Sequence, residues 1–96
     1  SPPDVESVLG GKYNSFRQHP HLEARLRQKI TPDEAQLALA ALVRREELET
    51  DAAVQLFGDM AGRFRDKVKF PEETTFGISD EQYVRNVVDT LYRKAR

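Results

Sequence analysis

The stretch TPDEAQLALAALVRREELE, residues 31–49, carries the strongest structural signal in the chain. Thr31 followed by Pro32 and then Glu34 is typical of a helix start, because the hydroxyl accepts from an unpaired backbone N–H and the carboxylate bonds the Thr31 amide in return. On a helical wheel the following residues form an apolar arc wider than the stripe of an ordinary surface helix. We therefore expect a central helix at about residues 32–48, covered by neighbours on two sides. The arc consists of Ala35, Leu37, Ala38, Leu39, Ala41, Leu42 and Leu48.

Composition indicates one folded domain with a charged surface. The 96 residues are 39% hydrophobic and 32% charged, with a formal net charge of -1, and a chain of this length buries enough apolar surface for one modest core. The charge is uneven, since residues 31–60 hold two Lys or Arg against seven Asp or Glu, whereas residues 1–30 hold five against three. A net charge near zero argues against a surface that binds polyanions everywhere.

Cysteine is absent from the chain, which excludes disulfides and thiolate metal sites and fits a reducing compartment. There is no apolar run of roughly 18 residues and no signal-peptide pattern, so no membrane span is expected. We expect a cytoplasmic protein. The start at Ser1 and the charged end at Arg96 suit a single helical domain, residues 1–96, excised from a longer chain.

Two further helices are expected before the central one. In residues 3–17 the apolar positions share one arc of a helical wheel, and this helical periodicity continues unchanged through Gly10 and Gly11. We therefore predict one helix that is weakened or kinked at the glycines. Its apolar positions are Val5, Val8, Leu9, Tyr13 and Phe16. Residues 20–30 then form a short helix with a narrow apolar stripe, Leu22, Leu26 and Ile30.

Two helices are expected after it. Residues 51–69, with Thr50 as the N-cap, carry apolar residues at alternating spacings of three and four, which predicts a core-facing helix. The core positions are Val54, Phe57, Ala61, Phe64 and Val68. Gly58 and Gly62 on its edge indicate close packing of a neighbour. Ser79 followed by Gln82 predicts the start of the last helix.

Taken together, these segments predict an all-α fold, a compact bundle of four to five helices that is partly orthogonal. The helices have unequal lengths and short connections, and no segment reads as a strand. No repeat of 20–50 residues indicates a solenoid.

Catalytic and metal-binding patterns are weak. His19 and His21 stand two residues apart and point away from one another on a helix, and the chain has no third His or Cys to complete a zinc site. No serine stands in a nucleophile motif. We expect no enzyme activity, no metal and no cofactor.

The function that we expect is a non-catalytic protein-interaction or regulatory module of a larger cytoplasmic protein. An inter-helix groove would accept a partner segment, or the domain would self-associate. An acidic edge beside an apolar groove selects a basic, amphipathic segment. The candidate partner-binding residues are the acidic Glu46, Glu47, Glu49 and Asp51, the apolar loop residues Phe76 and Ile78, and the border aromatics Tyr13 and Tyr92.

The alternative is nucleic-acid binding through the two terminal segments. The central helix, the turn and the next helix can be read as a helix-turn-helix, but the recognition end would then carry Glu49 and Asp51, which phosphates repel. A contiguous basic patch would favour this alternative, and basic residues scattered among carboxylates would favour a protein partner. The basic candidates are Lys12, Arg17, Arg25, Arg27, Lys29, Arg93 and Lys94.

Overall fold

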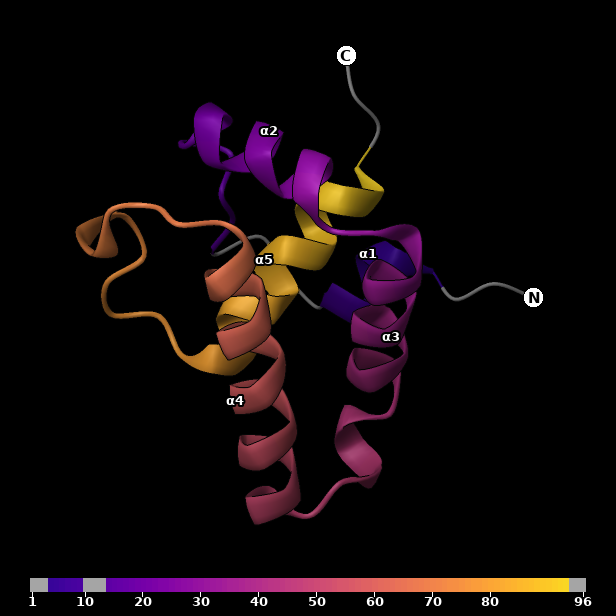
Figure 1. Cartoon of the computed structure of the whole chain (residues 1–96). Helices are drawn as coiled ribbons and strands as arrows, with labels where there is room; N and C mark the ends of the chain where they lie inside the picture. Colours follow the sequence, from indigo (N-terminus) through magenta and orange to yellow (C-terminus); the bar gives the residue numbers. More distant parts are fainter. Residues whose placement is uncertain (1–3, 10–13, 94–96) are drawn as a thin grey trace.

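The computed structural model describes residues 4–9 and 14–93. This part of the chain contains five α-helices and two 3-10 turns, joined by loops (Figure 1). No strand occurs among these residues, so the all-α prediction is confirmed. The radius of gyration of the Cα atoms is 12.6 Å. The elements are α1 (Val5–Leu9), α2 (Pro20–Lys29), α3 (Pro32–Val43), η1 (Arg45–Glu47), α4 (Thr50–Lys67), η2 (Glu72–Thr74) and α5 (Asp80–Tyr92).

The predicted helix starts at Thr31 and Ser79 are confirmed. Thr31 Oγ1 accepts from the Glu34 amide at 3.2 Å and the Thr31 amide donates to Glu34 Oε1 at 2.9 Å, which completes a capping box. Ser79 Oγ accepts from the Gln82 amide at 3.1 Å. The predicted N-cap at Thr50 is wrong, because α4 begins one residue earlier, with Glu49 as its N-cap, and makes no side-chain cap bond.

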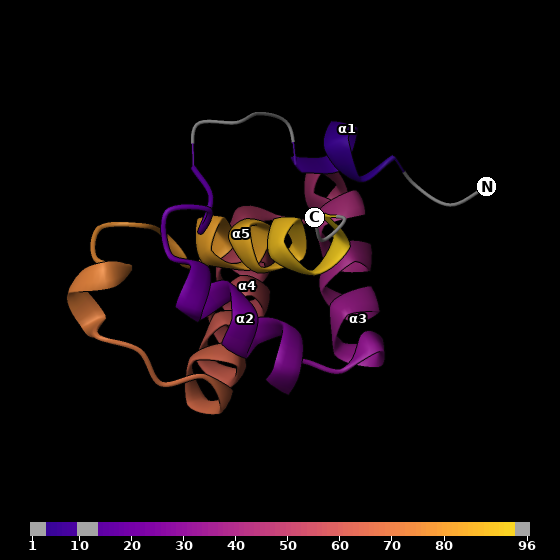
Figure 2. The same cartoon turned by 90° about the horizontal axis from the view of Figure 1, so that it is seen from above.

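The helix α5 lies at the centre of the molecule and packs against each of α1, α2, α3 and α4. It lies below α2 in Figure 1, and Figure 2 shows it running crosswise to α3 and α4. Its Tyr83 is buried and meets the ring of Phe16 edge to face, with the centroids 5.3 Å apart. The central position that the sequence assigned to residues 32–48 therefore belongs to α5, whose crossing with α3 and α4 makes the bundle partly orthogonal. Fully buried α5 residues are Val84, Val87 and Val88, together with the polar Asn86 and Thr90.

Contacts with both α1 and α5 cover α3 on two sides, as predicted, but its apolar arc is narrower than the sequence indicated. Leu37 is 63% exposed and Val43 is 47% exposed. The α-helix ends at Val43, and residues 45–47 form η1, so the predicted end near Leu48 is wrong. The run of seven apolar residues includes more positions than one helix presents to two neighbours. The buried positions are Ala35, Ala38, Leu39, Ala41 and Leu42.

The single helix predicted over residues 3–17 is wrong at its C-terminal end. Residues 14–19 are not helical, and their buried Phe16 is held in a turn in which the His19 amide donates to the Phe16 carbonyl at 2.8 Å. Insertion of the Phe16 ring against Tyr83 outweighs the helical periodicity of this segment. The predicted kink at Gly10 and Gly11 lies outside the described residues.

Most of the predicted face of α4 is buried, and Ala53 in its first turn is buried too, but Val54 is not. Figure 1 shows the start of α4 extending beyond α5, and Val54 is 68% exposed, so its placement in the core is wrong. The predicted close packing at the glycines is also wrong for Gly62, where a Cβ would have nothing within 4 Å. At Gly58 a Cβ would lie 3.5 Å from the Asp80 carboxylate, an ordinary contact.

Candidate functional site

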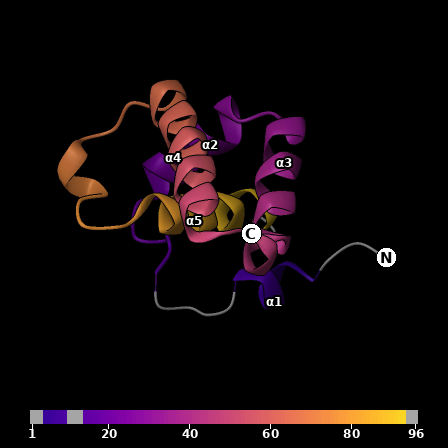
Figure 3. The same cartoon turned by 90° about the horizontal axis from the view of Figure 1, so that it is seen from below.

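A groove lined only by residues of α3 and α4 lies between these two helices. Both helices pack against α5, and Figure 3 shows them side by side. Leu37 stands at the edge of the groove, and Met60 and Phe64 supply the rest of its apolar lining. The groove has a volume of about 180 Å³. We call it the α3–α4 groove; it is lined by Glu34, Leu37, Asp59, Met60, Arg63 and Phe64.

Three charged groups border this apolar lining. Glu34 accepts from Lys67 Nζ at 2.6 Å and from the Thr31 amide at 2.9 Å, and these two bonds lower the pKa of its carboxyl. Asp59 accepts from the Gln55 side chain at 3.1 Å. Arg63 makes no ion pair with the described residues. The groove therefore combines an apolar lining with a rim that holds both signs of charge.

The predicted acidic residues lie where α3 and α4 connect, at the bottom of Figure 1. All of them are exposed. Arg45, which is adjacent in sequence, donates instead to Glu81 of α5 at 2.7 Å, so its charge is paired away from this turn. We call Glu46, Glu47, Glu49 and Asp51 the acidic turn.

The predicted loop residues and aromatics lie elsewhere. Phe76 is 84% exposed in the loop between η2 and α5, while Ile78 is half-buried and packs against the main core. This loop is on the left of Figure 1, apart from the acidic turn. Tyr92, 39% exposed, lies beside Ile30 and Pro32 at the end of α5. Tyr13 lies outside the described residues. The predicted partner-binding residues that the structure describes therefore do not come together into one surface.

Three of the five predicted basic residues that the structure describes are held by groups within the domain. Arg17 pairs with Asp89 at 3.1 Å, and Arg93 pairs with Asp89 and with the buried Glu23. Arg25 donates to the Lys69 carbonyl at 3.0 Å, and its guanidinium carbon lies 5.8 Å from the centroid of the Phe70 ring.

Two predicted basic residues, Arg27 and Lys29, are exposed on α2. Lys12 and Lys94 lie outside the described residues. Arg17 and Arg93 therefore lie among carboxylates, whereas the basic residues of α2 are exposed on a helix whose one carboxylate, Glu23, is buried.

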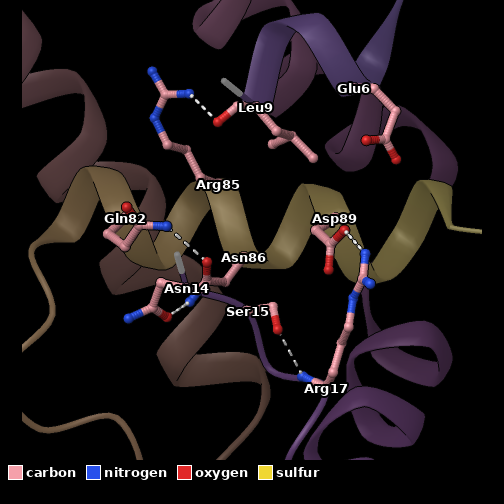
Figure 4. A pocket seen from close by; sticks show the side chains of 9 residues that line it. All are labelled: Glu6, Leu9, Asn14, Ser15, Arg17, Gln82, Arg85, Asn86 and Asp89. Carbon is pink, nitrogen blue, oxygen red and sulfur yellow. Dashed lines mark hydrogen bonds and ion pairs between the residues drawn. The ribbon is translucent and has the colours of Figure 1, made fainter. Parts of the chain in front are cut away.

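A small polar pocket of about 80 Å³ lies between α1, α5 and residues 14–17 (Figure 4). The side-chain amides of Gln82, Asn86 and Asn14 are in hydrogen-bond contact there, at 2.8 and 2.6 Å. Arg85 spans the pocket wall and donates to the Leu9 carbonyl at 3.3 Å. No buried polar side-chain atom in the described residues lacks a partner. The buried polar side-chain atoms of this pocket therefore already have partners within the domain.

Two of these features have little signal in the sequence. The helical periodicity places Leu37 in the core, and the one hint of its exposure is that the apolar arc is too wide for one helix. Arg85 lies 76 residues from Leu9 in sequence. Its sequence neighbours Val84 and Val87 indicate only a helix that is apolar on one side, so no local signal predicts its partner.

Within residues 4–9 and 14–93, no three His, Cys, Asp or Glu side chains lie together as metal ligands. None of the helices in this part of the chain is long and apolar enough to cross a membrane. No family model, curated protein or solved structure matches the chain. The site's own geometry is therefore the basis for any functional argument.

Proposed function

We propose that this domain is a non-catalytic protein-interaction module that binds the apolar face of a partner helix in the α3–α4 groove. The observation that carries the proposal is Leu37, a large aliphatic side chain that is 63% exposed at the edge of an apolar groove. A groove between two splayed helices suits the helix-in-groove mode, in which residues at i, i+3, i+4 and i+7 insert together. The cysteine-free sequence is consistent with action in the cytoplasm.

The charges specify the chemistry of the partner. The acidic turn closes one end of the helix pair, and its four carboxylates favour a partner helix with basic residues at that end. At the other end, Arg63 lines the groove and Lys67 is held by Glu34. The complementary partner is therefore an amphipathic helix with an apolar stripe and a basic end. Such charges set orientation and association rate more than affinity.

The test is a selection of helical peptides from a phage-displayed library against the immobilised domain. Peptides with apolar residues at helical spacing and a basic end should be enriched. They should shift the backbone amides around Leu37 and Met60 in labelled protein. The same peptides should bind at least tenfold more weakly to Leu37→Asp.

The matched control is Val54→Asp, because Val54 is an equally exposed aliphatic residue that does not line the groove. It should bind the selected peptides as the unaltered domain does. Enriched peptides that shift the Phe76 loop instead, or that bind Leu37→Asp unchanged, would show that the site is not the groove. Titration of the domain alone would reveal self-association as concentration-dependent shifts of the same amides.

The alternative, nucleic-acid binding, has less support, because Arg17 and Arg93 are occupied by Asp89 and Glu23. Its remaining support is the exposed pair Arg27 and Lys29. Short DNA and RNA should leave the amides of α2 unshifted at about 50 mM salt, where phosphate contacts are strong. Shifts on α2 that vanish at about 200 mM salt would favour the alternative instead.

A further inference from the structure

The helix α1 depends on the surface beneath it. It has five residues, none of them fully buried, and it packs against both α3 and α5. An isolated helix of this length is unstable in water, because too few hydrogen bonds offset the cost of nucleation. Its helical form therefore follows from docking. The side chains that dock are Val5, Val8 and Leu9, which are half-buried and pack against the main core.

Arg85 of α5 holds the C-terminal end of α1. Its Nη1 donates to the Val8 carbonyl at 2.8 Å and to the Leu9 carbonyl at 3.3 Å. Carbonyls in the last turn of a helix have no partner inside the helix, so any short helical segment that docks here presents the same acceptors. Figure 4 shows the guanidinium reaching the Leu9 carbonyl.

Arg85 is also held by residues outside α1. Its Nη2 and Nε donate to Glu81 Oε2 at 3.0 and 3.2 Å, and Glu81 Oε1 accepts from Arg45 at 2.7 Å. Burial opposes ionisation of Glu81, but the bonds from Arg45 and Arg85 outweigh it and lower the pKa of its carboxyl. The guanidinium is thus preorganised by α5 and η1, neither of which belongs to α1.

We propose that the surface between α3 and α5 is a second docking site for a short amphipathic helix of a partner protein, and that α1 is its intramolecular occupant. The occupant defines what fits: apolar side chains at i, i+3 and i+4, as in Val5, Val8 and Leu9, followed by free backbone carbonyls for Arg85. A partner segment of this pattern displaces α1. This site is separate from the α3–α4 groove and does not depend on the function proposed for it.

Tethering explains why the site is closed in the free domain. A segment on the same chain acts at an effective concentration in the millimolar range, so a free peptide with identical contacts competes poorly. A natural partner must make additional contacts, or α1 must first be released. The test therefore removes α1 from the site and supplies its sequence as a separate peptide.

The experiment uses the labelled full chain carrying Val8→Asp, which places a carboxylate at a half-buried apolar contact. The probe is a synthetic peptide with the sequence of residues 1–11. The peptide should bind Val8→Asp saturably at about millimolar concentration and shift the Arg85 side-chain signal. The unaltered domain, whose site is occupied, should bind it at least tenfold more weakly.

Three controls make the result specific. Ser7→Asp introduces the same charge at an exposed α1 position and should keep the site closed. A peptide carrying the Val8→Asp change should not bind. Addition of Arg85→Gln to the Val8→Asp chain should abolish peptide binding while the α5 amides keep their dispersion, which shows that the core is folded.

Equal binding to the unaltered domain and to Val8→Asp would overturn the proposal, because the peptide would then occupy another surface. So would the absence of binding by Val8→Asp at several millimolar peptide. If Val8→Asp unfolds the domain, Arg85→Gln alone serves as the second variant. It should release the α1 amides towards random-coil shifts, and unchanged α1 shifts there would refute the role of Arg85.

Discussion

Gly77 has a φ of +86°, the only positive φ among the described residues. A side chain in this region brings Cβ too close to the backbone, although the space around Gly77 is open, with nothing within 4 Å of a Cβ. Gly77→Ala should therefore lower the free energy of unfolding by about 1 kcal/mol through strain alone. Urea denaturation measures the change.

The matched substitution is Gly62→Ala, which has equally open surroundings but lies inside α4 with ordinary helical φ. It should raise the free energy of unfolding by about 0.5–1 kcal/mol, because alanine restricts the unfolded chain and favours the helix. Changes of opposite sign in the free energy of unfolding would show that backbone conformation, and not the space around the residue, decides the effect of the alanine. Two values of the same sign would contradict this account.

Glu34 is the residue that most directly links the stability of α3 to pH. Hydrogen bonds from Lys67 and from the Thr31 amide lower the pKa of its carboxyl in the folded domain below the ordinary value of 4.5. The unfolded chain then binds the proton more readily, so this contribution to stability is present above pH 4.5 and is lost as the pH falls through the folded pKa. Acid should therefore weaken the start of α3.

The prediction is tested with Glu34→Gln, which keeps an oxygen for the Thr31 amide but removes the charge. Stability of this variant should fall less steeply below pH 4.5 than that of the unaltered domain, as measured by urea midpoints across the acid range. Identical slopes would assign the acid sensitivity to other carboxylates.

At the scale of elements, a buried carboxylate attaches α2 to α5. Glu23 is 6% exposed and accepts from Thr90 Oγ1 at 3.0 Å and from Arg93. Arg93→Ala would leave this charge without its cationic partner, which should lower the free energy of unfolding by about 2–3 kcal/mol. Thermal or urea unfolding measures the loss.

Arg17→Ala provides the comparison. Arg93 also pairs with Asp89, and Arg17 pairs with that same carboxylate, but the Arg17 side chain is 51% exposed. Exposed pairs contribute little, so this loss should stay below about 1 kcal/mol. Equal losses in the free energy of unfolding would mean that the stabilisation comes from the pairs with Asp89 and not from the pair between Arg93 and Glu23.

The elements show what the sequence could predict. Short-range signals placed the starts of α3 and α5, because capping bonds join residues three positions apart. Exposure depends on which helices meet, and no local pattern states that α5 crosses α3 and α4. Periodicity therefore places Leu37 and Val54 in the core, where neither lies, and gives no sign of the groove beside Leu37. The sequence also treats Phe76 and Ile78 alike as loop residues for a partner, and no local pattern states that Phe76 is exposed while Ile78 packs against the core.

For the whole molecule, the extent to which each helix is packed predicts which helix opens first. The helix α5 packs against the four other α-helices, whereas α1 contributes no fully buried side chain. Amides of the buried α5 residues should exchange with solvent only when the domain unfolds globally. The Val8 amide, bonded to the Asp4 carbonyl at 3.0 Å, should exchange at least about 100-fold faster through undocking of α1 alone.

Native-state hydrogen exchange at increasing urea distinguishes the two classes. Exchange of the Val87 and Val88 amides should follow the global unfolding curve, while exchange of Val8 and Leu9 should be insensitive to low urea, because undocking exposes little surface. Arg85→Gln should accelerate α1 exchange more than α5 exchange, since it removes the bonds to the Val8 and Leu9 carbonyls. If all these amides exchanged at one rate, α1 would be part of the cooperative core and would not be available for exchange with a partner helix.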